Sequence, residues 1–363
     1  MNFVSNTLAS LANQNFFYSD GKAQTARIYI KIFNGGKYEY IISYSNTIDS
    51  TYADGKHSSC NKILKSWEIL SLRVGKVSCS DMKVASEPSA FTDVLFSGNK
   101  SVTLPEGGAV TSDTFIFEAE KDEYMCIEIT YKGEEIPCHS EVSVPAFILE
   151  NEKWIATDSI ELNRAKVPVP SFVGCNREVN KKIAYLGDSI TQGIGAEKNS
   201  YLHWTAVLSE LIGEENAYRN LGIGYARSSD AASDGVWLSK AKENDIVFLC
   251  LGVNDILRGG TKEGVCSNLE KIVGILKKEG IKIIIQTVPP FDYPQGIIEI
   301  WNGVNSYIEK SLSKVCDGFF DNRPVLSKSI EESHKTLYGG HPNNEGGKNW
   351  GKTLYEYVKT LEL

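Results

Sequence analysis

Three polar residues, far apart along the chain, have the side chains that acyl transfer requires. Ser189 follows an apolar run in KIAYLGDSITQGIG, Asn254 lies in LGVNDI, and His341 lies in YGGHPNNEGG. A serine hydroxyl becomes a strong nucleophile when an imidazole takes its proton, which imidazole can do near neutral pH. A carboxamide N–H can stabilise the oxyanion that forms when the serine attacks a carbonyl carbon. The three residues therefore predict a serine nucleophile with a histidine base.

Each residue also has an ordinary structural interpretation. Serine often starts a helix, asparagine often forms a turn with its own backbone, and a histidine beside a proline can simply belong to a loop. The chemical interpretation is favoured because the predicted elements bring all three residues to one edge of a sheet.

The second half of the chain alternates apolar runs with amphipathic ones. The apolar runs are 182–187, 217–223, 245–252 and 282–288, and the amphipathic runs are 201–213, 264–280, 297–315 and 344–361. This alternation indicates a parallel sheet with helices on both faces. In such sheets ligands bind beyond the carboxyl ends of the strands, which is where Ser189 and Asn254 follow their strands.

The first half has the pattern of β structure. Short runs rich in Ile, Tyr, Phe and Val are separated by turn sequences such as NGGK, LPEGG and EKDE. They predict an all-β, jelly-roll-like sandwich of antiparallel strands over residues 1–165. The prolines of VPVP predict an extended linker over residues 166–181, so that residues 182–363 form a second domain.

Length and composition are those of a soluble protein with more than one core. The chain has 363 residues, of which 42% are hydrophobic, and its net charge of −8 comes without a long basic run, which argues against nucleic acid as a partner. The eight cysteines form no C-x-x-C pair, so neither a zinc site nor a disulfide framework is expected. Without a secretory signal or an apolar run near the roughly 20 residues of a membrane helix, we expect a cytoplasmic protein with no membrane insertion, metal ion or cofactor. The alternative location is outside the cell, for a protein whose signal has been removed.

Four segments, LGDSITQG, NLGIG, LGVND and GGHPN, resemble the four blocks of the SGNH (GDSL) hydrolase family, in the family's order. The resemblance covers residues 180–361 and implies an α/β/α three-layer domain with a flavodoxin-like parallel sheet. It implies that Ser189 is the nucleophile, that His341 is the general base and acid, and that Asn254 and the Ser189 N–H are oxyanion donors. TVPPFDY and WNGVN are similar to a subgroup with an N-terminal β-sandwich, found among carbohydrate esterases and a few acyltransferases.

One departure from the family concerns the oxyanion hole. The family's second block has a glycine five residues after its asparagine, and the main-chain N–H of that glycine is an oxyanion donor. Counted from Asn220, this position holds Tyr225, directly after Gly224. The N–H of either residue is a candidate donor, because only proline lacks this group.

A second departure concerns the acid that orients the histidine. The family has an aspartate three residues before the histidine, where this chain has Tyr338. We expect a backbone carbonyl to orient His341 instead, as in resembling two-domain esterases, which leaves a Ser–His dyad. The alternatives are an impaired enzyme or another carboxylate, for which the candidates are Asp321, Glu331 and Glu332.

A second histidine competes for the role of base. In EESH, Glu331 stands three residues before His334, but no Pro-Asn follows. A solvated Glu–His pair is the commoner meaning of such a sequence, so His341 stays the favoured base. The other histidines, His57, His139 and His203, are expected to be structural.

The sequence predicts a serine esterase that removes a short acyl group, by expectation acetyl, from a carbohydrate or other small-molecule ester through an acyl-enzyme. One alternative is an acyltransferase to an alcohol acceptor, which would use the same residues. Another is a non-catalytic binding protein on an esterase scaffold, prompted by Tyr225 and Tyr338. Aromatic rings often line sugar sites, so Trp204 and Trp301 are candidate substrate contacts, although core packing is the commoner role.

Overall fold

A computed structural model describes residues 2–50, 57–78, 85–139, 141–155 and 166–361. The chain divides into two compact units, and each is described by itself. Unit 1 consists of Met1–Asp49 and Asn61–Val179, and unit 2 of Ser50–Cys60 and Asn180–Leu363. The sequence did not predict that Ser50–Cys60, which comes from the middle of the β-rich half, belongs to unit 2.

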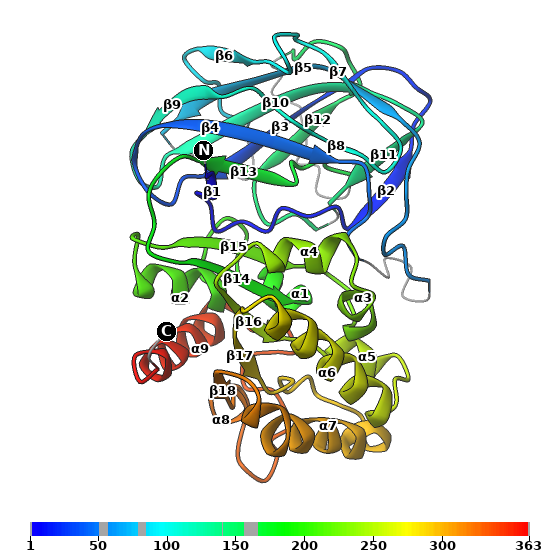
Figure 1. Ribbon diagram of the computed structural model, residues 1–363, viewed down its shortest axis with the longest axis vertical. Coiled ribbons are helices and arrows are strands. Elements are labelled where there is room, and N and C mark those ends of the chain that lie inside the picture. The colour runs from blue at the N-terminus through cyan, green and yellow to red at the C-terminus, as the bar shows by residue number, and fades with distance from the viewer. Residues whose placement is uncertain (1, 51–56, 79–84, 140, 156–165, 362–363) are drawn as a thin grey trace. The chain divides into compact units, whose positions relative to one another are not determined.

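Unit 1 is built of antiparallel strands, which confirms the predicted β class of this half (Figure 1). In the described residues, one sheet has the order β1 (Val4–Ser5), β13 (Phe172–Cys175), β4 (Gly36–Ser45) and β8 (Ala109–Thr111), with β9 (Phe115–Ala119) also paired with β4. Another has the order β12 (Ala146–Leu149), β3 (Gln24–Lys31), β10 (Tyr124–Lys132), β5 (Trp67–Val77) and β6 (Phe91–Val94), with β7 (Val102–Leu104) also paired with β5. A two-stranded sheet joins β11 (Glu135–Cys138) and β2 (Asn15–Tyr18). The jelly-roll arrangement stays a prediction.

The core of unit 1 follows from the strand sequences. β10 pairs with β3 on one side and with β5 on the other, and its residues are buried from Tyr124 to Tyr131. In β9, Phe115, Phe117 and Ala119 are buried while the residues between them are exposed, as expected for a strand with one face toward the core.

The prediction that residues 166–181 form a linker is wrong for most of this range. It contains β13, which pairs with β1 and β4 and so belongs to the first sheet of unit 1. No named strand includes the VPVP segment, but the short run FVGC that follows it forms β13. Unit 2 resumes at Asn180.

Unit 2 contains the predicted parallel sheet. Its order is β15 (Ala217–Gly222), β14 (Lys182–Gly187), β16 (Ile246–Cys250), β17 (Lys282–Gln286) and β18 (Gly318–Phe320), and every neighbouring pair is parallel. In chain order this is 2-1-3-4-5, the flavodoxin-like arrangement. The strand order reverses at β14, which is where a ligand site is expected in such sheets.

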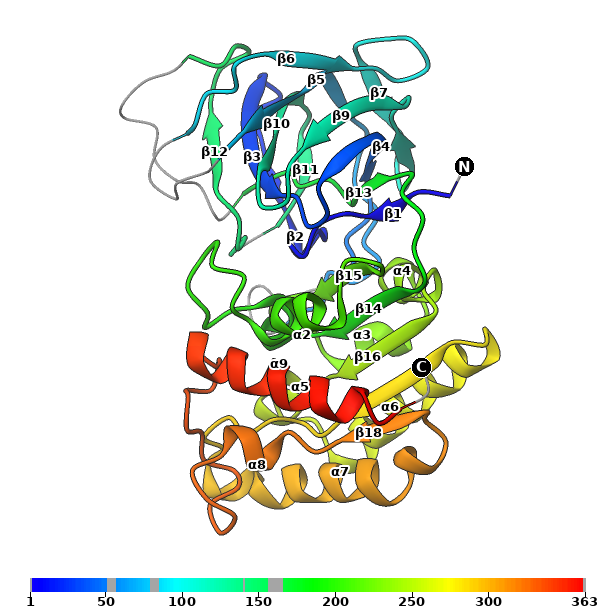
Figure 2. The same ribbon diagram turned by 90° about the vertical axis from the view of Figure 1, so that its left-hand side faces the viewer.

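Helices cover both faces of this sheet, as Figures 1 and 2 show, with α2 and α9 on one face and α4, α6 and α7 on the other. The helices are α1 (Ser189–Gln192), α2 (Trp204–Ile212), α3 (Ser228–Ala232), α4 (Val236–Lys242), α5 (Val253–Leu257), α6 (Lys262–Lys278), α7 (Ile298–Lys310), α8 (Arg323–Leu326) and α9 (Asn344–Val358), with 3₁₀ turns η1 (Gln295–Ile297) and η2 (Leu312–Lys314). The α/β/α architecture expected for this half is therefore present.

Three further sequence-based expectations bear on the whole chain. None of the helices in the described part of the chain has the length and apolar character needed to cross a membrane. The seven cysteines that the structure describes are free thiols, and Cys79 lies outside the described residues. The absence of a metal ion and of a cofactor stays a prediction.

Candidate active site

Ser189 lies at the carboxyl end of the first parallel strand. β14 ends at Gly187, and the Asp188 side chain accepts the Ile190 N–H at 3.0 Å, which caps α1. A Cβ atom at position 187 would lie 2.0 Å from the Thr191 Oγ1, so this turn requires a glycine. Ser189 is the first residue of α1, and the hydrogen bond to Asp188 fixes the turn that holds it at the strand end.

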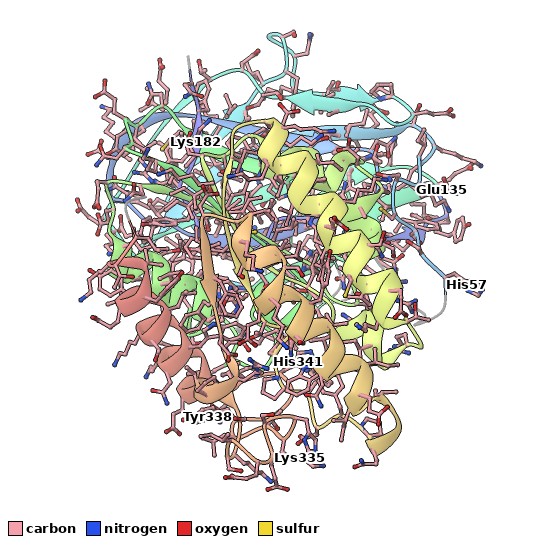
Figure 3. The ribbon with its side chains drawn as sticks, turned by 60° about the horizontal axis from the view of Figure 1, so that its bottom comes forward. His57, Glu135, Lys182, Lys335, Tyr338 and His341 are labelled. Atoms are coloured by element: carbon pink, nitrogen blue, oxygen red, sulfur yellow. The ribbon has the colours of Figure 1, made fainter. Side chains whose placement is uncertain are left out.

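His341 lies against Ser189. Its Nε2 is 2.8 Å from the Ser189 Oγ, within hydrogen-bonding range. The histidine comes from the segment before α9, and Figure 3 shows it well separated from Lys182, the first residue of β14. The Phe291 ring meets the imidazole edge to face at 5.2 Å between centroids, which helps to fix the plane of the imidazole.

Two local features bring the histidine to this position. The Asn343 side chain accepts the N–H groups of Glu345 and Gly346 and so caps α9, which explains the sequence HPNNEGG as a loop that enters a helix. Gly195 has a φ of 100°, and a Cβ atom there would lie 2.4 Å from the His341 carbonyl oxygen. A glycine at 195 therefore lets the two loops approach each other.

The two candidate oxyanion donors in the second block differ in the structure. The Gly224 N–H donates to the buried Gln192 Oε1 at 2.7 Å, so it is already used, and the expectation that it is a donor is wrong. The Tyr225 N–H has no hydrogen-bond partner among the described residues. Tyr225 has a φ of 64°, a conformation that glycine adopts far more readily, which accounts for a glycine at this position in the resembling family.

Asn254 and the Ser189 backbone complete the set of candidate donors. Asn254 lies in α5, after the turn at Gly252, and its Nδ2 donates one hydrogen to the Ala226 carbonyl at 3.1 Å. A carboxamide has a second N–H, which stays available for an oxyanion. The Ser189 N–H, at the start of α1, has no partner among the described residues.

The side chains of the site reach the surface of unit 2, whereas the residues that support them are buried. The residues that are half-buried are Ser189, Tyr225, Asn254 and His341. Asp188, Gln192 and Gly224 are buried. A candidate nucleophile, a candidate base and candidate oxyanion donors thus lie at one accessible edge of the sheet, an arrangement that could serve acyl transfer.

One family model matches the part of the chain that carries this site. Residues 185–348 match the model of the GDSL-like lipase/acylhydrolase family. Residues 185–348 therefore form a GDSL domain. An arylesterase from Vibrio mimicus is 28% identical over 121 residues, a match that covers 31% of this chain and 58% of that relative. The chain thus spans somewhat more than half the length of this curated relative.

Among solved structures, two G-D-S-L family lipolytic proteins are similar to this chain. The one from Desulfitobacterium hafniense is 21% identical, with a TM-score of 0.41 over 49% of this chain and 99% of that chain. The one from Veillonella parvula is 18% identical, with a TM-score of 0.41 over 50% of this chain and 99% of that chain. Each match covers about half of this chain.

Within the GDSL domain, Tyr338 does not take the place of the missing acid. Its hydroxyl accepts the Asn349 Nδ2 hydrogen at 2.8 Å, which directs the ring toward α9. Of the alternative carboxylates, Asp321 is bound by the Arg323 guanidinium through two contacts of 2.7 Å, while Glu331 and Glu332 are exposed. Orientation of His341 by a backbone carbonyl stays a prediction.

The structure also corrects the proposed substrate contacts of the GDSL domain. Trp204 is buried and stacks on Trp350 at 4.9 Å between ring centroids. Trp301 is buried, and its indole N–H donates to the Val288 carbonyl at 2.9 Å. Both rings are core side chains, so we do not assign either of them to substrate.

Two of the remaining histidines have the structural role expected of them. His139 and His203 are buried, with their Nδ1 atoms 2.9 Å from the Ala12 carbonyl oxygen and 2.7 Å from the Thr205 hydroxyl oxygen. His341, and not His334, makes the contact with Ser189.

The sequence did not reveal the roles of Gln192 and Phe291. Gln192 accepts the Gly224 N–H, and the Phe291 ring packs against His341. Gln192 lies in the quoted block GDSITQG, three residues after the serine, so its place on α1 beside the second block could have been anticipated. Phe291 has no such indication in the sequence, because its contact with His341 depends on two loops that meet in space.

Proposed function

We propose that this chain is a serine carboxylic ester hydrolase. It removes a short acyl group, by expectation acetyl, from a carbohydrate or other small-molecule ester. The single observation that carries the proposal is the 2.8 Å contact between the Ser189 Oγ and the His341 Nε2. Such a contact lets imidazole remove the hydroxyl proton while the oxygen attacks the carbonyl carbon.

Acylation transfers the acyl group to Ser189. The Oγ forms a bond to the carbonyl carbon, its proton passes to the His341 Nε2, and the carbonyl electron pair moves onto oxygen. That oxyanion accepts hydrogen bonds from the N–H groups of Ser189 and Tyr225 and from the Asn254 carboxamide, each worth about 3 to 4 kcal/mol in such sites. As the intermediate collapses, the ester C–O bond breaks and the imidazolium returns the proton to the leaving alcohol.

Deacylation repeats the sequence with water. His341 takes a proton from water as the water oxygen attacks the acyl carbon, and it then protonates the Ser189 Oγ as the bond to the carbon breaks. The products are the free acid and the restored serine. An alcohol in place of water gives the acyl transfer that the sequence left as an alternative.

The preference for a small acyl group is suggested by Tyr225, which puts a large side chain where the resembling family has a glycine. The carbohydrate half of the proposal is supported by the order of the chain, with an antiparallel β unit before the GDSL domain, as in the resembling carbohydrate esterases. The Vibrio mimicus relative is named an arylesterase, so aryl esters are suitable first test substrates. The cytoplasmic location expected from the sequence stays a prediction.

Hydrolysis of p-nitrophenyl acetate, butyrate and octanoate tests the proposal. We expect the acetate to give the highest kcat/KM, and Ser189→Ala and His341→Ala to lower it by at least about a thousandfold. His334→Ala is the matched control and should keep the wild-type rate. Equal rates for wild type and Ser189→Ala would refute the proposal. Product analysis with a competing alcohol separates hydrolysis, which yields only free acid, from transfer.

A further inference from the structure

One peptide group near the oxyanion hole is held from both sides. The Ala226 carbonyl accepts the Asn254 Nδ2 hydrogen at 3.1 Å, and the Arg227 N–H donates to the Asp230 Oδ2 at 3.0 Å. These two groups belong to the same planar peptide unit, which cannot twist without a large energetic penalty. A rotation at its N–H side therefore also moves the carbonyl that orients Asn254.

Asp230 is itself held by residues from a distant part of the sequence. Its carboxylate is buried and accepts the Ser50 hydroxyl at 2.7 Å on Oδ2 and the Ser58 hydroxyl at 3.0 Å on Oδ1. Both serines belong to Ser50–Cys60, the segment of the β-rich half that is part of unit 2. A buried carboxylate with several hydrogen-bond donors is a rigid support.

Burial raises the pKa of Asp230 above its usual value, and the hydrogen bonds from the Arg227 N–H and from the hydroxyls of Ser50 and Ser58 offset part of that rise. Each of these hydrogen bonds is stronger when the carboxylate is charged.

We propose that Asp230 is a positioning residue for the oxyanion hole and that Ser50 and Ser58 hold it in place. The chain of contacts runs from Ser50 through Asp230 and the Ala226–Arg227 peptide to the Asn254 carboxamide. This inference rests on the proposed function, because it assigns Asn254 a role in the transition state. It makes Ser50 and Ser58, from the β-rich half of the sequence, supporting residues of the active site.

Loss of the hydrogen bonds that hold Asp230 should lower kcat more than it changes KM. Oxyanion donors stabilise the transition state only when they are already in place, and a misplacement of 1 Å can lower a rate about a hundredfold. Tyr225 directly precedes the clamped peptide and has a positive φ, which persists only while its surroundings hold it. Both the carboxamide and the Tyr225 N–H therefore depend on the same peptide.

The helix that carries Asp230 has a second anchor, which makes the test practicable. Asp255 accepts the Ser228 N–H at 2.9 Å and the Ser228 hydroxyl at 2.6 Å, at the start of α3. Because this anchor is independent of Ser50, we expect Ser50→Ala to fold.

The experiment compares Ser50→Ala, Ser58→Ala and Asp230→Ala with Ser112→Ala. Ser112 is a buried serine of unit 1 whose oxygen accepts the Ile42 N–H at 3.0 Å, so it controls for the loss of a buried hydroxyl. We expect kcat for p-nitrophenyl acetate to fall about fivefold in Ser50→Ala and about fiftyfold in Asp230→Ala, with KM within about twofold of wild type. Ser112→Ala should keep the wild-type kcat.

A double-mutant cycle identifies the route of the effect. In an Asn254→Ala background, Asp230→Ala and Ser50→Ala should lower kcat much less than in wild type, because the group they orient has gone. If Asp230→Ala and Ser50→Ala lower kcat by the same factor in the Asn254→Ala background as in wild type, the proposal is overturned. A wild-type kcat in both Asp230→Ala and Ser50→Ala alone overturns it too. If Asp230→Ala does not fold, the Ser50→Ala/Ser58→Ala double variant takes its place in the cycle.

The Ser189→Ala variant separates the two levels of inference. Hydrolysis that survives in Ser189→Ala overturns the proposed function and, with it, the positioning role. Hydrolysis that depends on Ser189 but not on Ser50 or Asp230 overturns only the positioning role.

Discussion

The Gln192 Oε1 accepts the Gly224 N–H at 2.7 Å, and this bond decides which backbone group of the second block is available to a substrate. With the Gly224 N–H engaged, the next N–H along the chain, that of Tyr225, is the one without a partner among the described residues. Because Gln192 lies on α1 with Ser189, one short helix carries both the proposed nucleophile and the side chain that fixes the backbone before the proposed oxyanion donor.

Gln192→Met keeps the size of the side chain and removes the acceptor. We expect kcat for a short aryl ester to fall about ten- to a hundredfold with little change in KM, because the Tyr225 N–H is no longer held in place. The matched control is Gln286→Met, which removes a buried acceptor of the Trp350 indole N–H, 2.9 Å away, outside the site. An unchanged kcat in Gln192→Met would contradict this role.

Substitution of Tyr225 tests its positive φ. Tyr225→Gly keeps the N–H and suits the conformation, so we expect kcat within about threefold of wild type and the free energy of unfolding unchanged or raised by up to about 1 kcal/mol. Tyr225→Val, with a β-branched side chain, should lower the free energy of unfolding by about 1 to 2 kcal/mol. Urea unfolding measures both, and equal stability of the Gly and Val variants would show that the conformation carries no strain.

The hydroxyl of Tyr338 is predicted to be irrelevant to catalysis. It is hydrogen-bonded to Asn349, so Tyr338→Phe should lower the free energy of unfolding by about 1 kcal/mol and leave kcat unchanged. The pH profile of kcat/KM should also stay the same. A shifted acid limb in Tyr338→Phe would mean that this hydroxyl acts on His341 after all.

Asp188 gives the stability of the GDSL domain a pH dependence. Burial raises its pKa from the usual 3.8 to about 7, so between these values the folded chain binds a proton that the unfolded chain has released. Between these two values the folded state binds more protons, and the free energy of unfolding therefore falls as the pH rises, by at most about 4 kcal/mol at 1.4 kcal/mol per unit.

Asp188→Asn should remove this contribution, because an amide does not ionise and can still accept the Ile190 N–H. Urea unfolding from pH 4 to pH 7 should give a less negative slope for Asp188→Asn than for wild type. Asp113→Asn, which alters an acceptor of the Ser97 and Gly98 N–H groups in unit 1, controls for the loss of a carboxylate. Identical slopes in wild type and Asp188→Asn would contradict the raised pKa.

Much of the site was predictable because its residues follow strands whose pattern is plain. The apolar runs that end at Ser189 and before Asn254 form adjacent parallel strands, and parallel strands must place their carboxyl ends together. His341 was predictable from its block, since Asn343 marks the start of a helix. Short elements such as α3, α5 and β18 were not anticipated, because five residues or fewer give no clear periodicity.

What the sequence could not supply were relationships set by tertiary packing. Whether Gly224 or Tyr225 offers its N–H depends on the amide of Gln192, which spacing alone does not reveal. Tryptophan has a large apolar ring, and no local pattern separates a binding ring from a core ring such as Trp301. The contact of Ser50 with Asp230 spans 180 positions in the sequence and has no local indication at all.

The central claim is that His341 activates Ser189 as a nucleophile, and the rate of phosphonylation by a fluorophosphonate probe tests it most directly. Intact-protein mass spectrometry gives this rate, and peptide mapping gives the modified residue. The account predicts modification at Ser189 alone, none in Ser189→Ala, a rate lowered at least about a hundredfold in His341→Ala, and a wild-type rate in His334→Ala. Modification of a different residue, or a wild-type rate in His341→Ala, would contradict it.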